Sequence, residues 1–268
     1  MIFNKLFGKY KFITMSVILV FLVACLIFVV AHFYGNDDNS INGNENVSES
    51  QLILYDDKDS KLSGDSCFLV VCNDDSDKII FMFLADFRIY SSSIVLTPLA
   101  PDTVGIDGRT YDEIYSYGGI NMLKNSIESV RNLAIDRYAF IDRKGMSKLT
   151  DLMGDVVLNV DEEFTYQSSD KSYEVKKGEN KMGSDMLYTY LHLYSIRNSD
   201  TETVILLSEI VNMYLADVKT EDIEDLFLSL TNCFNTDLSI SDYYSAKSDI
   251  EYLIDHNIKC IIANDVGN

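Results

Sequence analysis

The sequence predicts an α/β fold of the α+β sandwich type, in which a mixed central β-sheet is flanked by helices and preceded by one N-terminal transmembrane helix. Short apolar runs separated by polar turns are typical of central strands that are covered on both faces. Further along the chain, apolar residues at helical spacing alternate with strand-like segments. A long uncharged apolar run near the N-terminus predicts the membrane helix.

The apolar run Phe12–Phe33 predicts a transmembrane helix over residues 12–34. As a helix it would extend roughly 33 Å, which is enough to span a bilayer core. Three lysines precede the run, whereas Asp37 and Asp38 follow it, and this charge bias keeps residues 1–11 cytoplasmic. We therefore expect a single-pass protein of the cell membrane whose C-terminal domain is extracytoplasmic.

Two alternatives to this anchor are disfavoured. A cleaved signal peptide would have a shorter apolar run, followed by a site of small residues. A lipid-modified Cys25 would normally be followed by polar residues, but apolar residues continue past it.

Residues 35–64 are rich in Asn, Asp and Ser and predict a flexible extracytoplasmic tether. Residues 65–268 are enough for one well-packed domain.

The elements of this domain can be predicted in order from their apolar patterns and caps. Gly118 and Gly119 favour a tight turn into a helix over an anion site, and Ser199 with Glu202 forms a predicted capping box. The expected elements are strands at Cys67–Cys72, Ile79–Ala85 and Ile94–Leu99, a helix over Ile120–Leu133, a strand at Arg137–Asp142, a short helix ending at Gly154, a strand at Asp155–Asp161, a helix after Ser199 and another opened by Thr220.

The composition excludes some partners and one kind of metal site. The chain has 42 acidic and 22 basic residues, a net charge of −20 at pH 7, which disfavours nucleic acid and anionic lipid surfaces. Outside the membrane run, Cys67, Cys72, Cys233 and Cys260 lack the spacing of a zinc site. We expect buried free thiols, with a disulfide between Cys233 and Cys260 as the open alternative.

Three acidic residues lie where predicted strands end. Asp74 and Asp77 occupy the turn between the first two strands, and Asp102 follows the third. Carboxylates at strand ends can hold Mg²⁺ against a pyrophosphate, because this cation prefers oxygen ligands and keeps several waters. The alternative is that they are ordinary solvated turn residues of an acidic chain.

From about Cys67 to Leu253, the order of segments resembles the LytR-CpsA-Psr family. The best block is the YSYGG of residues 115–119, followed by IESVRNLAIDRYAFIDRKGMSKLTDLMGDVVLNVDEEF. Members of this family are single-pass membrane proteins that transfer glycopolymers from polyprenyl-pyrophosphate carriers to the bacterial cell wall. The resemblance implies an envelope location and partners that are polyprenyl-linked glycopolymers or envelope proteins.

The family motifs place two Mg²⁺-associated acids on Asp74 and Asp77, but the arginine expected before the second acid is Asp75. The family's PRDT motif, whose arginine contacts the pyrophosphate, is Ala-Pro-Asp-Thr here. It leaves Asp102 as the candidate catalytic residue and supplies no arginine. Compared with the family motif, this chain therefore has both of the acids that the resemblance associates with Mg²⁺ and an acid in place of the basic residue beside them.

The family's later arginines are also replaced. Lys181–Tyr194 resembles its LxGxxALxYxRxR helix, with His192 and Tyr194 where two arginines belong. The DxGRxxRQ segment corresponds to residues 200–208, which contain no arginine. Arg109 in a Gly-flanked loop, together with His192 and Tyr194, remains as a candidate substrate-binding residue. Lysine or histidine does not reproduce the bidentate hold of arginine on phosphate.

These differences predict an envelope-assembly protein that is catalytically weak or inactive and binds a polyprenyl lipid or a partner. One alternative is an active Mg²⁺-dependent phosphotransferase that moves glycopolymer from a polyprenyl-pyrophosphate carrier to peptidoglycan with bases recruited from elsewhere. Another is a structural or sensory ectodomain. The tyrosine row at residues 188, 190 and 194 fits a lipid pocket in the family, although such rows are more often core.

Overall fold

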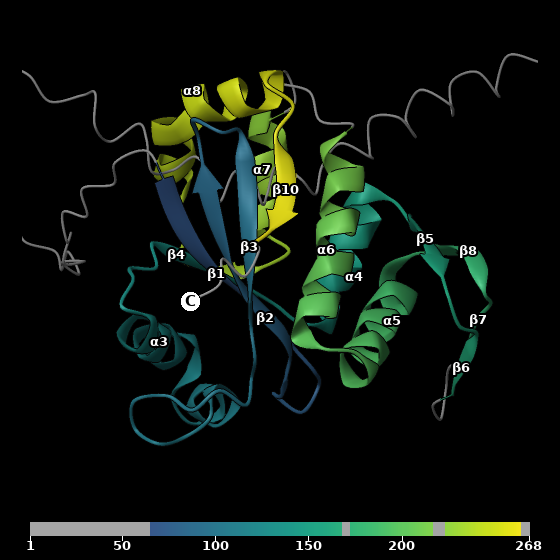
Figure 1. Cartoon of the computed structure of the whole chain (residues 1–268). Helices are drawn as coiled ribbons and strands as arrows, with labels where there is room; N and C mark the ends of the chain where they lie inside the picture. Colours follow the sequence, from purple (N-terminus) through teal and green to yellow (C-terminus); the bar gives the residue numbers. More distant parts are fainter. Residues whose placement is uncertain (1–64, 168–171, 217–222, 264–268) are drawn as a thin grey trace, which may run out of the picture.

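The computed structural model describes residues 65–167, 172–216 and 223–263. Its centre is a six-stranded sheet with the order β10-β3-β2-β1-β4-β9 (Figure 1). The strands are β1 (Asp65–Asn73), β2 (Ile79–Arg88), β3 (Ser93–Leu99), β4 (Arg137–Ile141), β9 (Asn235–Thr236) and β10 (Lys259–Ile262).

The sheet is mixed, as the sequence predicts. β1 pairs antiparallel with β2 and parallel with β4, while β3 is antiparallel to β2 and parallel to β10. The four strands predicted before residue 142 are therefore confirmed. β1 and β4 end side by side, so the residues that follow them meet at one edge of the sheet.

Helices cover both faces of the sheet. They are α3 (Tyr111–Arg131), α4 (Arg143–Met153), α5 (Ser184–Arg197), α6 (Asp200–Leu215), α7 (Ile223–Thr231) and α8 (Ile240–Asp255). Side chains of β1 alternate between two apolar cores: Leu69 and Val71 pack with α3, whereas Phe68 and Val70 face the core formed with the other five helices. In Figure 1, α3 lies on the opposite side of the sheet from α6.

Two helix starts show how local sequence sets the fold. α6 begins with the predicted capping box of Ser199 and Glu202. α3 begins earlier than predicted, because Thr110 and Glu113 form another capping box ahead of the glycine pair. Gly119 has a φ of 69° and kinks α3, so the predicted turn is present but lies within the helical segment.

Two small ribbons extend beyond α5, away from the main sheet (Figure 1). β5 (Val156–Val160) pairs with β8 (Gly178–Met182), and β6 (Phe164–Gln167) pairs with β7 (Ser172–Val175). β5 confirms the strand predicted after the glycine that ends α4. The ribbons place the side chains of β7 beside α5.

Some predictions concern residues outside the described ranges. The transmembrane helix, the tether and the helix start at Thr220 lie there, and within the described ranges no helix is long and apolar enough to cross a membrane. The four cysteines of the described part are free thiols. Burial raises the pKa of Cys260 to about 12, so this thiol remains protonated at neutral pH.

Candidate functional site

A cleft of about 650 Å³ lies at the edge of the sheet where β1 and β4 end. The turn between β1 and β2 forms one wall, and the first residues of α4 and α5 form the other. It is lined by Asn73, Asp74, Asp75, Asp77, Tyr115, Phe140, Asp142, Arg143, Lys144, Ser147, Ser184 and Asp185. Ligands of α/β proteins commonly bind beyond the carboxyl ends of strands, which makes this cleft the candidate site.

Asp74 and Asp77 accept hydrogen bonds from within and beside the turn. Oδ1 of Asp74 accepts hydrogen bonds from the backbone N–H groups of Ser76 at 2.8 Å and Lys78 at 3.0 Å. Oδ1 of Asp77 accepts one from Nδ2 of Asn73 at 3.1 Å, and Asp77 adopts a left-handed φ of 61°. Both predicted metal ligands therefore line the cleft and also have a structural role.

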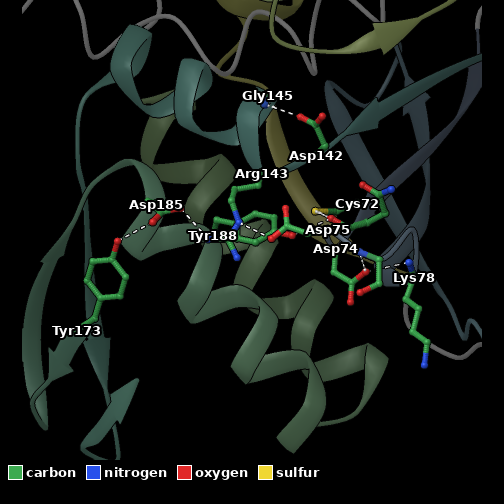
Figure 2. Close-up of polar contacts among 12 residues, drawn as sticks. Cys72, Asp74, Asp75, Lys78, Asp142, Arg143, Gly145, Tyr173, Asp185 and Tyr188 are labelled. Atoms are coloured by element: carbon green, nitrogen blue, oxygen red, sulfur yellow. Dashed lines mark hydrogen bonds and ion pairs between the residues drawn. The ribbon is translucent and has the colours of Figure 1, made fainter. Parts of the chain in front are cut away.

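Arg143, the first residue of α4, lies between two of the cleft carboxylates (Figure 2). Its Nε donates to Oδ2 of Asp75 at 3.0 Å and its Nη1 to Oδ1 of Asp185 at 2.7 Å. The guanidinium also lies 4.3 Å from the centre of the Tyr188 ring. Burial lowers the pKa of Arg143, but the hydrogen bond to Asp185 and the charge of Asp75 outweigh it and raise the pKa above its ordinary value.

Two tyrosines fix the surroundings of Arg143. The buried Tyr188 hydroxyl donates to the backbone carbonyl of Asn73 at 2.9 Å, which joins α5 to the end of β1. The Tyr173 hydroxyl, from β7, donates to Oδ2 of Asp185 at 2.6 Å (Figure 2). Burial raises the pKa of Tyr188, so its phenol stays protonated and acts as a donor.

A smaller cavity of about 230 Å³ is also lined by Arg143. Its lining shares Asp74, Asp75 and Arg143 with the cleft and adds side chains from α5 and β6. The further residues are Ser76, Tyr166, Thr189, His192 and Leu193. The structure thus brings the predicted residue His192 close to the acidic turn.

The remaining predicted residues do not line either cavity. Tyr194 packs against the core, with its ring 5.8 Å from that of Tyr190. Arg109 pairs with Asp107 and lies 4.3 Å from the centre of the Tyr117 ring. Their substrate-binding roles stay predictions.

Asp102 is exposed in the turn after β3 and does not line either cavity. Burial is the main cause that raises the pKa of the Asp200 carboxyl, and the negative charge of Asp102 raises it further. The structure therefore keeps Asp102 apart from the cleft that Asp74 and Asp77 share. Its catalytic role stays a prediction.

The donor set can be tested against Mg²⁺. Asp74 and Asp77 offer the oxygen ligands that this cation prefers, and Mg²⁺ is often held by one or two carboxylates plus substrate phosphates. Across residues 65–167, 172–216 and 223–263, no group of three or more His, Cys, Asp or Glu could hold a metal ion. Asp74 and Asp77 thus supply oxygen donors of the kind that Mg²⁺ prefers without forming a protein cage, and Mg²⁺ binding here stays a prediction.

Sequence reasoning missed Arg143 and Asp185. The arginine that it kept as a candidate, Arg109, does not line the cleft. Arg197 is the last residue of α5 and lies 5.4 Å from the centre of the Phe164 ring. Arg143 directly follows the strand predicted to end at residue 142. A position just after a strand at the sheet edge was the available signal for it.

Comparisons with known proteins agree on the fold. The sequence profile of the LytR_cpsA_psr family matches residues 45–265. A search of curated protein sequences gives no significant match. A crystal structure of a candidate transcription regulator from Eubacterium siraeum has 18% identity and a TM-score of 0.62, covering 83% of this chain and 89% of its own.

Two further solved structures are similar. TagV of B. subtilis has 14% identity and a TM-score of 0.61, with 76% of this chain and 86% of that chain covered. TagT bound to LIIa-WTA has 13% identity and a TM-score of 0.55, with 75% and 78% covered. At such low identities these structures establish the shared fold alone.

Proposed function

Because this chain belongs to the LytR_cpsA_psr family, we propose that it acts in cell-envelope glycopolymer assembly as a membrane-anchored, extracytoplasmic protein with weak or absent phosphotransferase activity. The family domain is related to cell-wall glycopolymer transferases, and the similar protein TagT is solved with LIIa-WTA bound. The predicted N-terminal helix would keep the domain beside membrane-bound lipid carriers.

The charge of the cleft carries this proposal. Five aspartates line it, at positions 74, 75, 77, 142 and 185, against the two bases Arg143 and Lys144. Arg143 already pairs with two of these carboxylates. A pyrophosphate carries several negative charges and needs unoccupied, fixed donors to be bound and activated. The cleft offers such an anion few free positive charges.

The tyrosine row of α5 favours the core interpretation over a lipid pocket. Leu187, Tyr188 and Tyr190 are buried in the main apolar core. The two cavities described above are lined mainly by polar and charged side chains. The domain would therefore contribute by binding a glycopolymer or an envelope protein. Native mass spectrometry of the purified protein should show no co-purified polyprenyl lipid, and stoichiometric lipid would contradict this part of the proposal.

A transfer assay tests the main proposal. The purified full-length chain is incubated with a lipid-linked oligosaccharide, an acceptor glycan and Mg²⁺, beside a family member that retains the motif arginines. We expect transfer by the family member and little or none by this chain. Robust transfer that disappears in Asp77→Ala would overturn the proposal.

The second candidate is a diverged Mg²⁺-dependent phosphotransferase, and one observation favours it. Arg143 lies in the same cleft as Asp74 and Asp77 and is not one of the motif arginines named above, so it is a base available at this site. In this case Asp74 and Asp77 would hold Mg²⁺ and Arg143 would contact the phosphate. This candidate requires transfer by the wild-type chain and its loss in Arg143→Gln.

The third class, a structural or sensory ectodomain, has no specific support from the cleft. A pull-down of envelope proteins with the full-length chain would address it. Protease accessibility in intact cells tests the location, because an extracytoplasmic domain is digested from outside while the N-terminal tail is protected.

A further inference from the structure

The ion pair of Arg143 and Asp75 is common to the two cavities. Both residues line the cleft of about 650 Å³ and the cavity of about 230 Å³. Asp75 also stands where the family resemblance expects an arginine, so this chain has reversed the charge at that position. Its acid now meets an arginine supplied by α4.

We propose that Asp75 is a specificity-determining residue, an internal anion that occupies Arg143 and excludes phosphate-bearing ligands from the cleft. The inference rests on the proposed function and explains how the acidic cleft avoids anions. A carboxylate and a phosphate oxygen use the same N–H donors of a guanidinium. While Asp75 occupies Nε, an incoming phosphate must displace it to bind the Nε–Nη2 edge through two hydrogen bonds.

The donor geometry of Arg143 leaves one edge to be filled. Nη1 donates a hydrogen bond to Asp185, and the guanidinium lies over the ring of Tyr188. The Nε edge faces Asp75 across 3.0 Å. Because its plane and one end are fixed, Arg143 is positioned to take a second anion at that edge whenever Asp75 does not.

Asp75 and Asp185 differ in how firmly they are held. The Asp185 side chain is 18% exposed and also accepts a hydrogen bond from Tyr173. The Asp75 side chain is 69% exposed and is held by its hydrogen bond from Arg143 Nε. Asp75 is therefore the exchangeable partner, because exposed ion pairs contribute little to stability.

The cleft offers further positive charge once Asp75 is removed. Lys144 follows Arg143 on α4 and lines the same cleft. Arg143 and Lys144 also begin α4, whose N-terminal dipole favours anions, and the Asp142 side chain already accepts the Gly145 N–H there at 2.6 Å. With a neutral side chain at position 75, Arg143 and Lys144 would be left to interact with an anion in the cleft.

Binding of inorganic pyrophosphate tests the inference, without divalent cations so that no metal bridges the ligand to the aspartates. Isothermal titration with the full-length chain is compared for wild type, Asp75→Asn and Asp75→Asn/Arg143→Gln. We expect Asp75→Asn to bind roughly tenfold tighter than wild type or better, and the double variant to lose the gain. Asp75→Asn/Arg143→Lys should lose most of it, because lysine lacks the fork.

Asp151→Asn is the matched control. It removes the same charge from an exposed position of α4 outside both cavities, so it should leave pyrophosphate binding at the wild-type level. Circular dichroism confirms that each variant is folded. Equal binding by wild type and Asp75→Asn, or an equal gain in Asp151→Asn, overturns the inference. Neither result bears on the proposed function, because the transfer assay is the test of that proposal.

Discussion

The buried hydrogen bond of Tyr188 should hold the cleft together. Tyr188→Phe removes the hydroxyl that donates to the Asn73 carbonyl at 2.9 Å and leaves that carbonyl without this donor. Tyr188 is 1% exposed, so water cannot easily replace the bond. The Asn73 carbonyl would keep only the weak Cys72 Sγ–H contact at 3.9 Å, and a hydrogen bond lost in such a buried place costs about 1–2 kcal/mol. For a domain of this size the melting temperature should fall by roughly 3–6 °C.

Thermal unfolding of the full-length chain at pH 7, followed by near-ultraviolet circular dichroism, measures this change. Tyr90→Phe is the matched control, because Tyr90 is 92% exposed and should leave the melting temperature unchanged. The phenol of Tyr188 stays protonated at this pH, since burial raises its pKa. If Tyr188→Phe melts within about 1 °C of wild type, then α5 is not joined to β1 in this way.

Three further changes test other parts of the fold by the same melting measurement. Gly145→Ala should lose about 2 kcal/mol or fail to fold, because its Cβ would lie 2.3 Å from the Cys233 carbonyl oxygen; an unchanged melting temperature would contradict that packing. Ser199→Ala should cost about 1 kcal/mol by removing the cap of α6, and no loss would argue against the capping box. Burial raises the pKa of Asp249 from 3.8 to about 6, so the wild type loses stability as pH rises from about 4 through 6. Asp249→Asn should therefore melt above wild type at pH 7 and equal to it near pH 4, and the same difference at both values would refute the assignment.

The sequence predicts the main sheet well where strands are apolar and contiguous. β1, β2 and β3 are nearly continuous apolar runs because both faces are covered, and that pattern is readable without any tertiary information. The box of Ser199 and Glu202 was equally readable. Thr110 and Glu113 carry the same kind of signal for the start of α3. The prediction placed that start after the glycine pair instead, because glycines usually mark the end of a regular element.

Other elements depend on partners far away in the chain. The short edge strand β10 pairs with β3, more than 160 residues earlier, and no pattern within its own residues specifies that partner. The Asn212 side chain of α6 makes two hydrogen bonds with the backbone of Cys260, one to its carbonyl and one from its N–H. These two bonds pair the backbone N–H and carbonyl of Cys260 at the edge of the sheet. The sequence of β10 alone could not predict this partner, because it lies on α6.

The candidate site shows the same limit in its charges. Asp74 and Asp77 could be predicted because they occupy one short turn between two strands, and both line the cleft. Arg143 lies in sequence 68 residues from Asp75, so counting arginines at motif positions could not reveal that they pair. That Asp75 of the turn and Arg143 of α4 form one ion pair becomes evident only when the two are seen at 3.0 Å. Because Arg143 pairs with two carboxylates, the arrangement of charge, and not the number of arginines, decides what the cleft can bind.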